Sequence, residues 1–306
     1  VGLSTPLSVA RSIEAATRVE PDANLCIISL PGEFVAREVR KALRNDMHVM
    51  LFSDNVPLEQ EIDLKRMAKE RGLLMMGPDA GTAIINGKPL CFANVVRQGD
   101  IGLVGASGTG LQEVSVAIHK EGAGVSQAIG TGGRDLKNDE VGGTMMLMGI
   151  EALKNDDATS VITVISKPPS NSVAEKVISA LKETGKPCVV HFIGLAARKN
   201  EGNVHFAGNL EETAGMSVAL SRGENYTART FTVSDSEVER IVEAESRGMA
   251  GEQQFLRGLF TGGTLADEAL ILLHRSIGDV FSNNQEEKYQ LPDPHTSQGH
   301  TIVDLG

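Results

Sequence analysis

Short apolar runs alternate with amphipathic stretches through most of this chain, and many of the runs end at glycine. The apolar run 25–30 leads into a helical stripe of Phe34, Val39 and Leu43, and the run 48–52 follows it. A chain that alternates strand, helix and strand with short connections forms a parallel sheet with right-handed crossovers. The pattern therefore predicts an α/β fold of doubly wound parallel sheets.

The alternation restarts near Asp100 and continues to Gly223, which predicts a second α/β unit. A polar stretch with one exposed helix follows, and residues 255–306 offer the strand, glycine loop and helix that would begin a third unit. The chain opens at Val1 and ends in the strand-like TIVDLG. We therefore expect it to be a piece of a longer polypeptide.

Composition excludes several classes of partner. The 29 Lys and Arg stand against 40 Asp and Glu, aromatic residues make up 4% and Trp is absent, so nucleic acid is not an expected partner. The three Cys form no CxxC pair and the His residues no HxxxH or HxH pattern, so we expect no metal site. No apolar run is long enough to cross a membrane, and no signal peptide opens the chain. We therefore expect a cytoplasmic protein without a membrane partner.

The most informative stretch is GLVGASGTGLQE, at residues 102–113, which joins an apolar run to an amphipathic one. The free N–H groups and partial positive charge of a helix N-terminus suit a phosphate. Ser107 and Thr109 could cap the helix or donate to an anion. The loop lacks the Lys of a P-loop and the glycine spacing of a dinucleotide site. Taken alone, it is equally consistent with a phosphate site and with a capped turn.

Further glycine clusters follow other expected strands. They are MMGPDAGT at 75–82, GTGGRD at 130–135 and FTGGTLADE at 260–268. Ligands of open α/β sheets bind at the carboxyl ends of the strands, where such loops lie. Their repetition favours an anion-binding edge, although sheet turns alone would also explain each loop.

These motifs carry a family resemblance. GPDAG, GLVGASGTGLQE, GTGGRD and KPCVVHFIG, in that order, resemble the α subunit of succinyl-CoA synthetase and its NDP-forming acyl-CoA synthetase relatives. The longer series that includes DANLCIISLPGEF, FLRGLFTGGTLADEA and SQGHTIVDLG resembles the FdrA family over nearly the whole chain. The resemblance implies a Rossmann-like CoA-binding-type domain at 1–97, truncated at its N-terminus, and a flavodoxin-like ligase domain at 98–223. A linker with a helix at 224–254 and the incomplete start of a second ligase-type domain at 255–306 would follow.

The chain departs from the synthetases at two places that bear on chemistry. The synthetases carry phosphate on a histidine in a Gly-His-Ala-Gly context, whereas NVHFAG here places Phe206 directly after His205. The glutamate that steadies that histidine is replaced by SKPPSN, which supplies Lys167. A phosphohistidine relay would lose both its aligned nucleophile and its partner, so His205 is only a possible phosphohistidine. In the synthetases the first glycine loop of the CoA site precedes the region that matches 25–30, and no such loop occurs in residues 1–24. CoA is therefore only a possible cofactor, and no other cofactor is expected.

Loops that hold phosphate without a covalent relay fit direct transfer from an acyl phosphate. The FdrA resemblance implies a carbamoyltransferase subunit of allantoin and purine catabolism, which interconverts carbamoyl phosphate plus oxamate with oxalurate plus phosphate. Arg134 would then neutralise substrate charge and Lys167 would add a second cation, although both are equally explained as ordinary surface or ion-paired residues. The residues expected to bind phosphate or substrate are Ser107, Gly108, Thr109, Gly110, Gly132, Gly133, Gly77, Pro78 and Asp79.

Two other functions stay open. One is an acyl-CoA synthetase of the succinate–CoA ligase type that binds CoA, and the other is a non-catalytic member that binds small anions or proteins. The expected partners are a small anionic substrate (carbamoyl phosphate or oxamate) or CoA, together with partner subunits or further copies of the chain. Among the carboxylates near the loops, the sequence does not choose between Asp79, Glu113 and Asp135.

Overall fold

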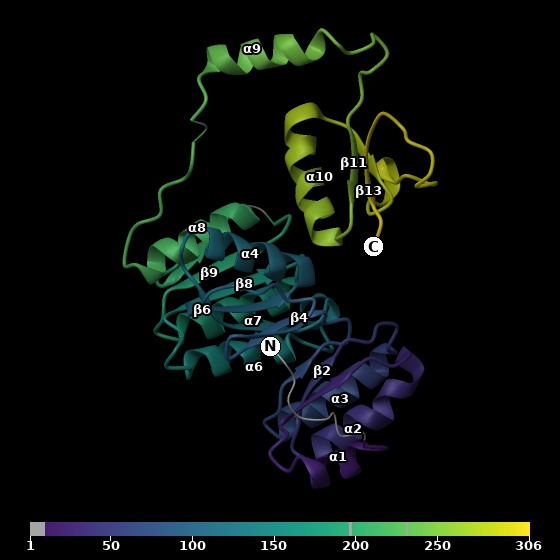
Figure 1. Ribbon diagram of the computed structural model, residues 1–306, viewed down its shortest axis with the longest axis vertical. Helices are drawn as coiled ribbons and strands as arrows, with labels where there is room; N and C mark the ends of the chain where they lie inside the picture. The colour runs from purple at the N-terminus through teal and green to yellow at the C-terminus, as the bar shows by residue number, and fades with distance from the viewer. Residues whose placement is uncertain (1–9, 196–197, 231) are drawn as a thin grey trace, which may run out of the picture. The chain divides into compact units, whose positions relative to one another are not determined.

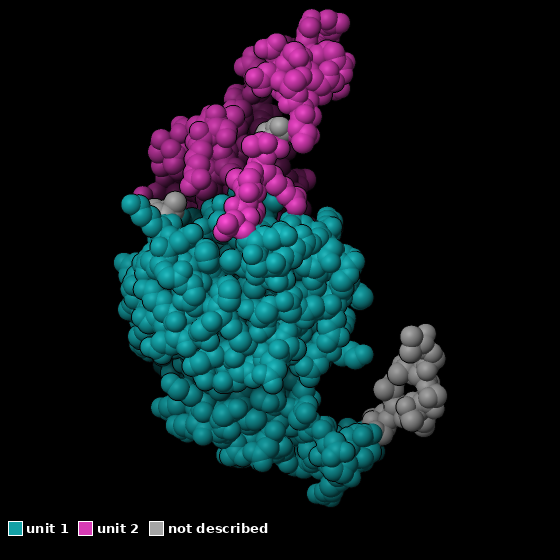
Figure 2. All heavy atoms as spheres, turned by 90° about the vertical axis from the view of Figure 1, so that its left-hand side faces the viewer, with its two compact units in different colours: residues 1–224 teal, residues 225–306 magenta. Residues whose placement is uncertain are grey.

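The computed structural model describes residues 10–195, 198–230 and 232–306, and the chain divides into two compact units after Glu224 (Figures 1 and 2). The first unit contains two β-sheets and the second unit contains a third. Most neighbouring strands in these sheets are parallel, which confirms the expected α/β class. In the described ranges, no helix combines the length and apolar character that a bilayer crossing needs.

The first sheet is small and entirely parallel. Its strands are, in order, β1 (Leu25–Ile28), β2 (His48–Leu51) and β3 (Met75–Met76). Helix α2 (Val35–Arg44) buries one apolar face against β1 and β2, because its apolar residues repeat at helical spacing. Helix α1 (Ile13–Val19) packs on α2, and α3 (Leu58–Glu70) lies between α2 and the second sheet's helices.

The second sheet has seven strands in the order β10-β9-β8-β6-β7-β4-β5. Five of them are parallel, while β4 pairs antiparallel with both β5 and β7. The interior strand β8 reads VITVIS and is buried along its whole length, as expected for a strand covered on both faces. The strand bounds are β4 Thr82–Ile85, β5 Lys88–Cys91, β6 Gln98–Ala106, β7 Val125–Gly130, β8 Val161–Ser166, β9 Cys188–Phe192 and β10 Val204–Phe206.

Helices cover both faces of this sheet. Helices α4 (Gly108–Lys120) and α8 (Leu210–Ser221) pack together on one face, and α6 (Thr144–Lys154) and α7 (Asn171–Lys182) pack on the other (Figure 1). A short helix, α5 (Arg134–Lys137), precedes α6. This doubly wound arrangement brings the turns after β6, β7 and β8 to one edge of the sheet.

The second unit is smaller. Its parallel sheet has the order β11-β13-β12, from β11 (Arg257–Phe260), β13 (His300–Asp304) and β12 (Val280–Ser282). Helix α10 (Gly263–Ile277) supplies its core with Ala266 and Leu270. The short η2 (Glu287–Tyr289) follows β12, while the preceding α9 (Asp235–Ser246) has no buried residue.

One domain boundary differs from the one expected. The hairpin 82–91 falls within the expected first domain, 1–97, but it hydrogen-bonds with the second sheet through the Ile84–Ala128 pair. Among the described residues, α1 begins at Ile13 after its cap Ser12. Helix α6 begins only at Thr144, because Gly143 before it adopts a left-handed backbone with φ of 72°.

Candidate functional site

The candidate site begins where β6 ends. Ser107 is buried, has an extended backbone and caps α4, because its Oγ accepts a hydrogen bond from the Gly110 N–H at 3.0 Å. A Cβ at Gly110 would lie 2.5 Å from that same Oγ, so glycine is required for the cap. Gly108 is exposed, and a Cβ there would meet only the Thr82 hydroxyl at 3.7 Å. The first turn of α4 therefore presents backbone to solvent beside β4.

Two further glycine loops pack against each other at the same edge. Gly132 has a φ of 84°, and a Cβ on it would lie 2.3 Å from the Pro78 carbonyl oxygen. Only glycine allows this approach, so the loop after β7 touches the loop after β3. Gly133 next to it is exposed and has open space around its Cα. Gly77 is likewise held at a φ of 106° against the Leu51 carbonyl oxygen.

Charged side chains meet at this edge. Burial raises the pKa of the Asp79 carboxyl, and repulsion by the Asp54 carboxylate raises it further. The Arg134 guanidinium and the Lys167 ammonium act on the same carboxyl in the opposite direction. Arg134 follows β7 and Lys167 follows β8, the two strands that flank β6, so both lie at the carboxyl ends of the strands beside the α4 start. The loop that carries Asp79 reaches the same end through the Gly132–Pro78 approach.

Arg134 has two protein partners. Its Nε forms an ion pair with the Glu61 Oε2 at 2.8 Å, and its Nη2 donates to the Val56 carbonyl at 2.7 Å. Its side chain nevertheless keeps 41% of its surface exposed, whereas Glu61 keeps only 1%. Arg134 is therefore held by Glu61 of α3, while part of its side chain stays accessible to solvent.

Buried charges that no sequence pattern predicted lie behind this arginine. The Lys65 ammonium lies 2.9 Å from Glu61 Oε1 and 2.8 Å from Asp135 Oδ1, and it donates to the Thr131 carbonyl at 3.0 Å. Asp135 also accepts from the backbone N–H of Met145 and so caps the start of α6. The sequence does contain Glu61 and Lys65 four residues apart, but this spacing on a helix normally indicates an exposed ion pair and not a buried one.

The three candidate carboxylates can now be told apart. Asp135 is fully buried and serves the ion pair with Lys65. Glu113 is exposed on α4, one helical turn beyond Gly110. Asp79 is the one whose pKa the positive charges of Arg134 and Lys167 act to lower, against the larger effect of burial.

His205 lies well away from the glycine loop of α4. It pairs with Val189 of β9, which pairs with Thr163 of β8, which pairs with Leu103 of β6. The His205 backbone is therefore three strand spacings from β6, about 14 Å, and its row lies four residues before Ser107, about 13 Å along the strands. The structure does not bring this possible phosphohistidine to the other candidate residues.

The surroundings of His205 are those of a sheet edge. Its Nδ1 lies 3.3 Å from the Asn200 side-chain amide, and the neighbouring Phe206 ring lies under the Arg198 guanidinium at 5.3 Å. The fourth glycine cluster, at 260–268, forms the turn before α10 in the other unit. In the described parts of the chain, no group of three or more His, Cys, Asp or Glu is arranged to hold a metal ion.

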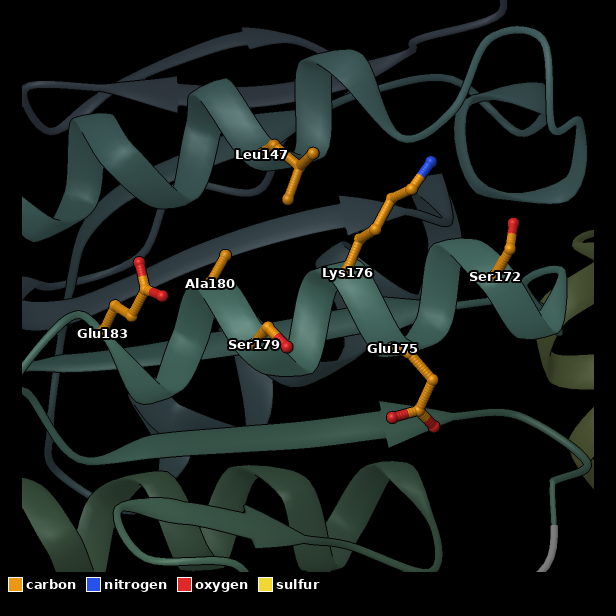
Figure 3. A pocket seen from close by; sticks show the side chains of 7 residues that line it. All are labelled: Leu147, Ser172, Glu175, Lys176, Ser179, Ala180 and Glu183. Carbon is orange, nitrogen blue, oxygen red and sulfur yellow. The ribbon is translucent and has the colours of Figure 1, made fainter.

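A surface groove of about 440 Å³ runs along α7 beside α6 (Figure 3). Leu147 lines its α6 side, and Ser172, Lys176 and Glu183 lie along α7. The labelled carboxylates and the ammonium point in different directions rather than toward one point. We therefore take the loops at the carboxyl ends of β3, β6, β7 and β8, and not this groove, as the candidate site.

Comparisons with known proteins agree with this fold. A family model described as a CoA binding domain matches residues 96–194. The match covers β6 to β9 of the second sheet and only the last two residues of 1–97, the range for which the resemblance implies a CoA-binding-type domain. The Escherichia coli protein YahF is 48% identical over 297 residues, which are 96% of this chain and 57% of YahF. The chain thus spans just over half the length of that relative.

More distant matches include a ligase subunit by sequence and two solved structures by fold. The succinate–CoA ligase α subunit 2 of Archaeoglobus fulgidus is 26% identical over 67% of this chain and 70% of its own length. The ATP citrate lyase of Methanothrix soehngenii, solved with citrate and coenzyme A, superposes with a TM-score of 0.52 at 20% identity over 79% of this chain and 42% of its own. An acetyl-coenzyme A synthetase of Korarchaeum cryptofilum gives 0.54 at 14% identity over 87% and 57%. These matches confirm the resemblance to the FdrA and succinyl-CoA synthetase α-subunit group.

Proposed function

We propose that this protein binds the phosphate of an acyl phosphate at the α4 N-terminus and takes part in carbamoyl transfer between carbamoyl phosphate and oxamate. The observation that carries the proposal is the meeting of three loops at one sheet edge. One offers exposed backbone at Gly108 after β6, and the others carry Arg134 and Lys167 after the flanking strands β7 and β8, which supports a shared site. A helix N-terminus stabilises phosphate through free N–H groups, and a guanidinium suits a carboxylate.

The chemistry needs no phosphorylated histidine. The oxamate nitrogen attacks the carbamoyl carbon, the bond from that carbon to the phosphate oxygen breaks with its electron pair on the phosphate, and the nitrogen's proton passes to the released phosphate as oxalurate forms. The α4 N-terminus would stabilise the charge that grows on the departing phosphate. The distance of His205 from this edge supports direct transfer. Because the chain spans only part of its relatives, we propose that the complete activity requires partner subunits or further copies.

Titration calorimetry of the chain with carbamoyl phosphate at low ionic strength tests the proposal. Gly108→Val should weaken the binding of carbamoyl phosphate by about tenfold or more, because the valine methyl groups would cover the exposed backbone. The valine Cβ itself fits, since the nearest atom would be the Thr82 hydroxyl at 3.7 Å. Gly251→Val is the matched control, since that glycine also has open space and lies in the other unit. Carbamoyl phosphate that fails to bind, or binds equally to Gly108→Val, would contradict the phosphate site.

A CoA ligase is the second candidate, and the CoA binding domain match at 96–194 favours it. CoA titrated into the same sample distinguishes the two. A ligand present at 100 times its Kd adds about 2.7 kcal/mol to the free energy of unfolding, so a thermal shift with CoA alone would support the ligase. A shift with carbamoyl phosphate alone would support transfer. The cytoplasmic location expected from the sequence stays a prediction.

A further inference from the structure

The buried charges on α3 lie directly behind the proposed site. Glu61 and Lys65 each keep at most 2% of their side-chain surface exposed, yet both carry charge. Groups of this kind are costly to bury unless they are paired, and here each of them has two ionic partners. One partner of each, Arg134 for Glu61 and Asp135 for Lys65, belongs to the loop after β7. Helix α3, which packs with the first sheet, is therefore bound by two ion pairs to the segment that follows β7 of the second sheet.

The two contacts do different things. Lys65 bonds to the Thr131 carbonyl and pairs with Asp135, which lie on either side of Arg134 in the sequence, and so holds the backbone of this segment. Glu61 pairs instead with the Arg134 side chain, through Oε2 and Nε at 2.8 Å. A carboxylate against Nε, with the Val56 carbonyl on Nη2, leaves the guanidinium little freedom to rotate.

We propose that Glu61 is a positioning residue that holds the Arg134 guanidinium for the carboxylate of the acceptor substrate. This inference rests on the proposed function and deepens it by separating two anion subsites. The phosphate subsite is the α4 N-terminus, which does not depend on Glu61. The carboxylate subsite is Arg134 with Lys167, and its acceptor is a small carboxylate such as oxamate.

The separation predicts a selective effect. Glu61→Met removes the partner of Arg134 but leaves Lys65 paired with Asp135 and with the Thr131 carbonyl. Oxamate affinity should fall by about tenfold, because the buried ion pair that holds the guanidinium is lost, while the affinity for inorganic phosphate should stay within about twofold. A general structural defect would weaken both probes together. Calorimetric titration of each probe measures the two constants.

Matched variants complete the test. Glu59→Met changes an exposed carboxylate on the same helix and should leave both affinities unchanged. Glu61→Met should add nothing further to oxamate binding in an Arg134→Gln background, because Glu61 acts through that arginine. Glu61→Gln, which has the same shape, replaces Glu61→Met if the apolar side chain prevents folding.

The outcomes separate the two proposals. Wild-type protein that binds neither probe overturns the proposed function and this inference with it. Wild-type protein that binds oxamate with the same affinity as Glu61→Met overturns only the inference. Equal losses for both probes would show that Glu61 merely stabilises the fold, and an additive loss in the Arg134→Gln background would also exclude positioning through Arg134.

Discussion

At the scale of single residues, the site depends on backbone that only certain side chains permit. Gly132 and Gly77 lie at positive φ with neighbouring carbonyl oxygens where a Cβ would sit. Asp79 also lies at positive φ, 56°, where Asp and Asn are tolerated better than most residues. The conformation of these loops therefore follows from residue type as well as from packing.

Asp79 should make stability depend on pH. Burial first, and then Asp54, raise its pKa from the ordinary 3.8, so the folded protein binds this proton more tightly than the unfolded chain does. The contribution of protonated Asp79 to stability is present below the unfolded pKa and is lost as pH rises through the folded pKa. Asp79→Asn should thus raise the unfolding midpoint at pH 7, and the gain should vanish below about pH 3.8.

Denaturant melts of Asp79→Asn and wild type across this pH range measure the effect. Asp157→Asn, in an exposed loop, serves as the control. A variant that is less stable than wild type at pH 7 would mean that the attraction of Arg134 and Lys167 outweighs burial and the repulsion from Asp54.

At the scale of elements, α3 connects the two sheets of the first unit. The same helix packs on α2 and on α6, and Met145 of α6 belongs to the core of the first sheet. Its buried Lys65 bonds to the loop after β7, so the charged contact lies inside an apolar interface. The first unit therefore behaves as one compact body despite its two sheets.

Lys65→Met should lower the free energy of unfolding by about 3–5 kcal/mol, since it leaves Glu61 and Asp135 buried without their shared cation. Urea denaturation followed by circular dichroism gives the value. Lys69→Met, at an exposed position of the same helix, should change stability by less than about 0.5 kcal/mol. A loss as small as that of Lys69→Met would show that water reaches the pair.

At the scale of the molecule, the two units are joined by a segment with few buried residues. Helix α9 within it has none, and Val238 and Val242 are exposed on it. Limited proteolysis should therefore cut within 225–256 first and release a folded fragment that ends near Glu224. Mass spectrometry identifies the cuts. Early cleavage inside the seven-stranded sheet would contradict the division into units.

Much of this architecture could be predicted from local patterns. Alternating apolar runs and helical stripes marked the strands β1, β2 and β6 to β9, because periodicity is a local property. The pattern also marked the α4 start, where Ser107 caps the helix. It misassigned the hairpin 82–91, because strand pairing joins residues that are distant in sequence, such as Ile84 and Ala128.

The sequence by itself determined the α/β class, the glycine loops and the candidate residues at the strand ends. Which of these candidate residues lie near one another follows only from the tertiary structure. It brought Asp79, Arg134 and Lys167 to one edge, left His205 three strands away, and paired Lys65 with Asp135 across 70 positions of the chain. Charge pairing and strand order depend on contacts between distant segments, and no local pattern records those contacts.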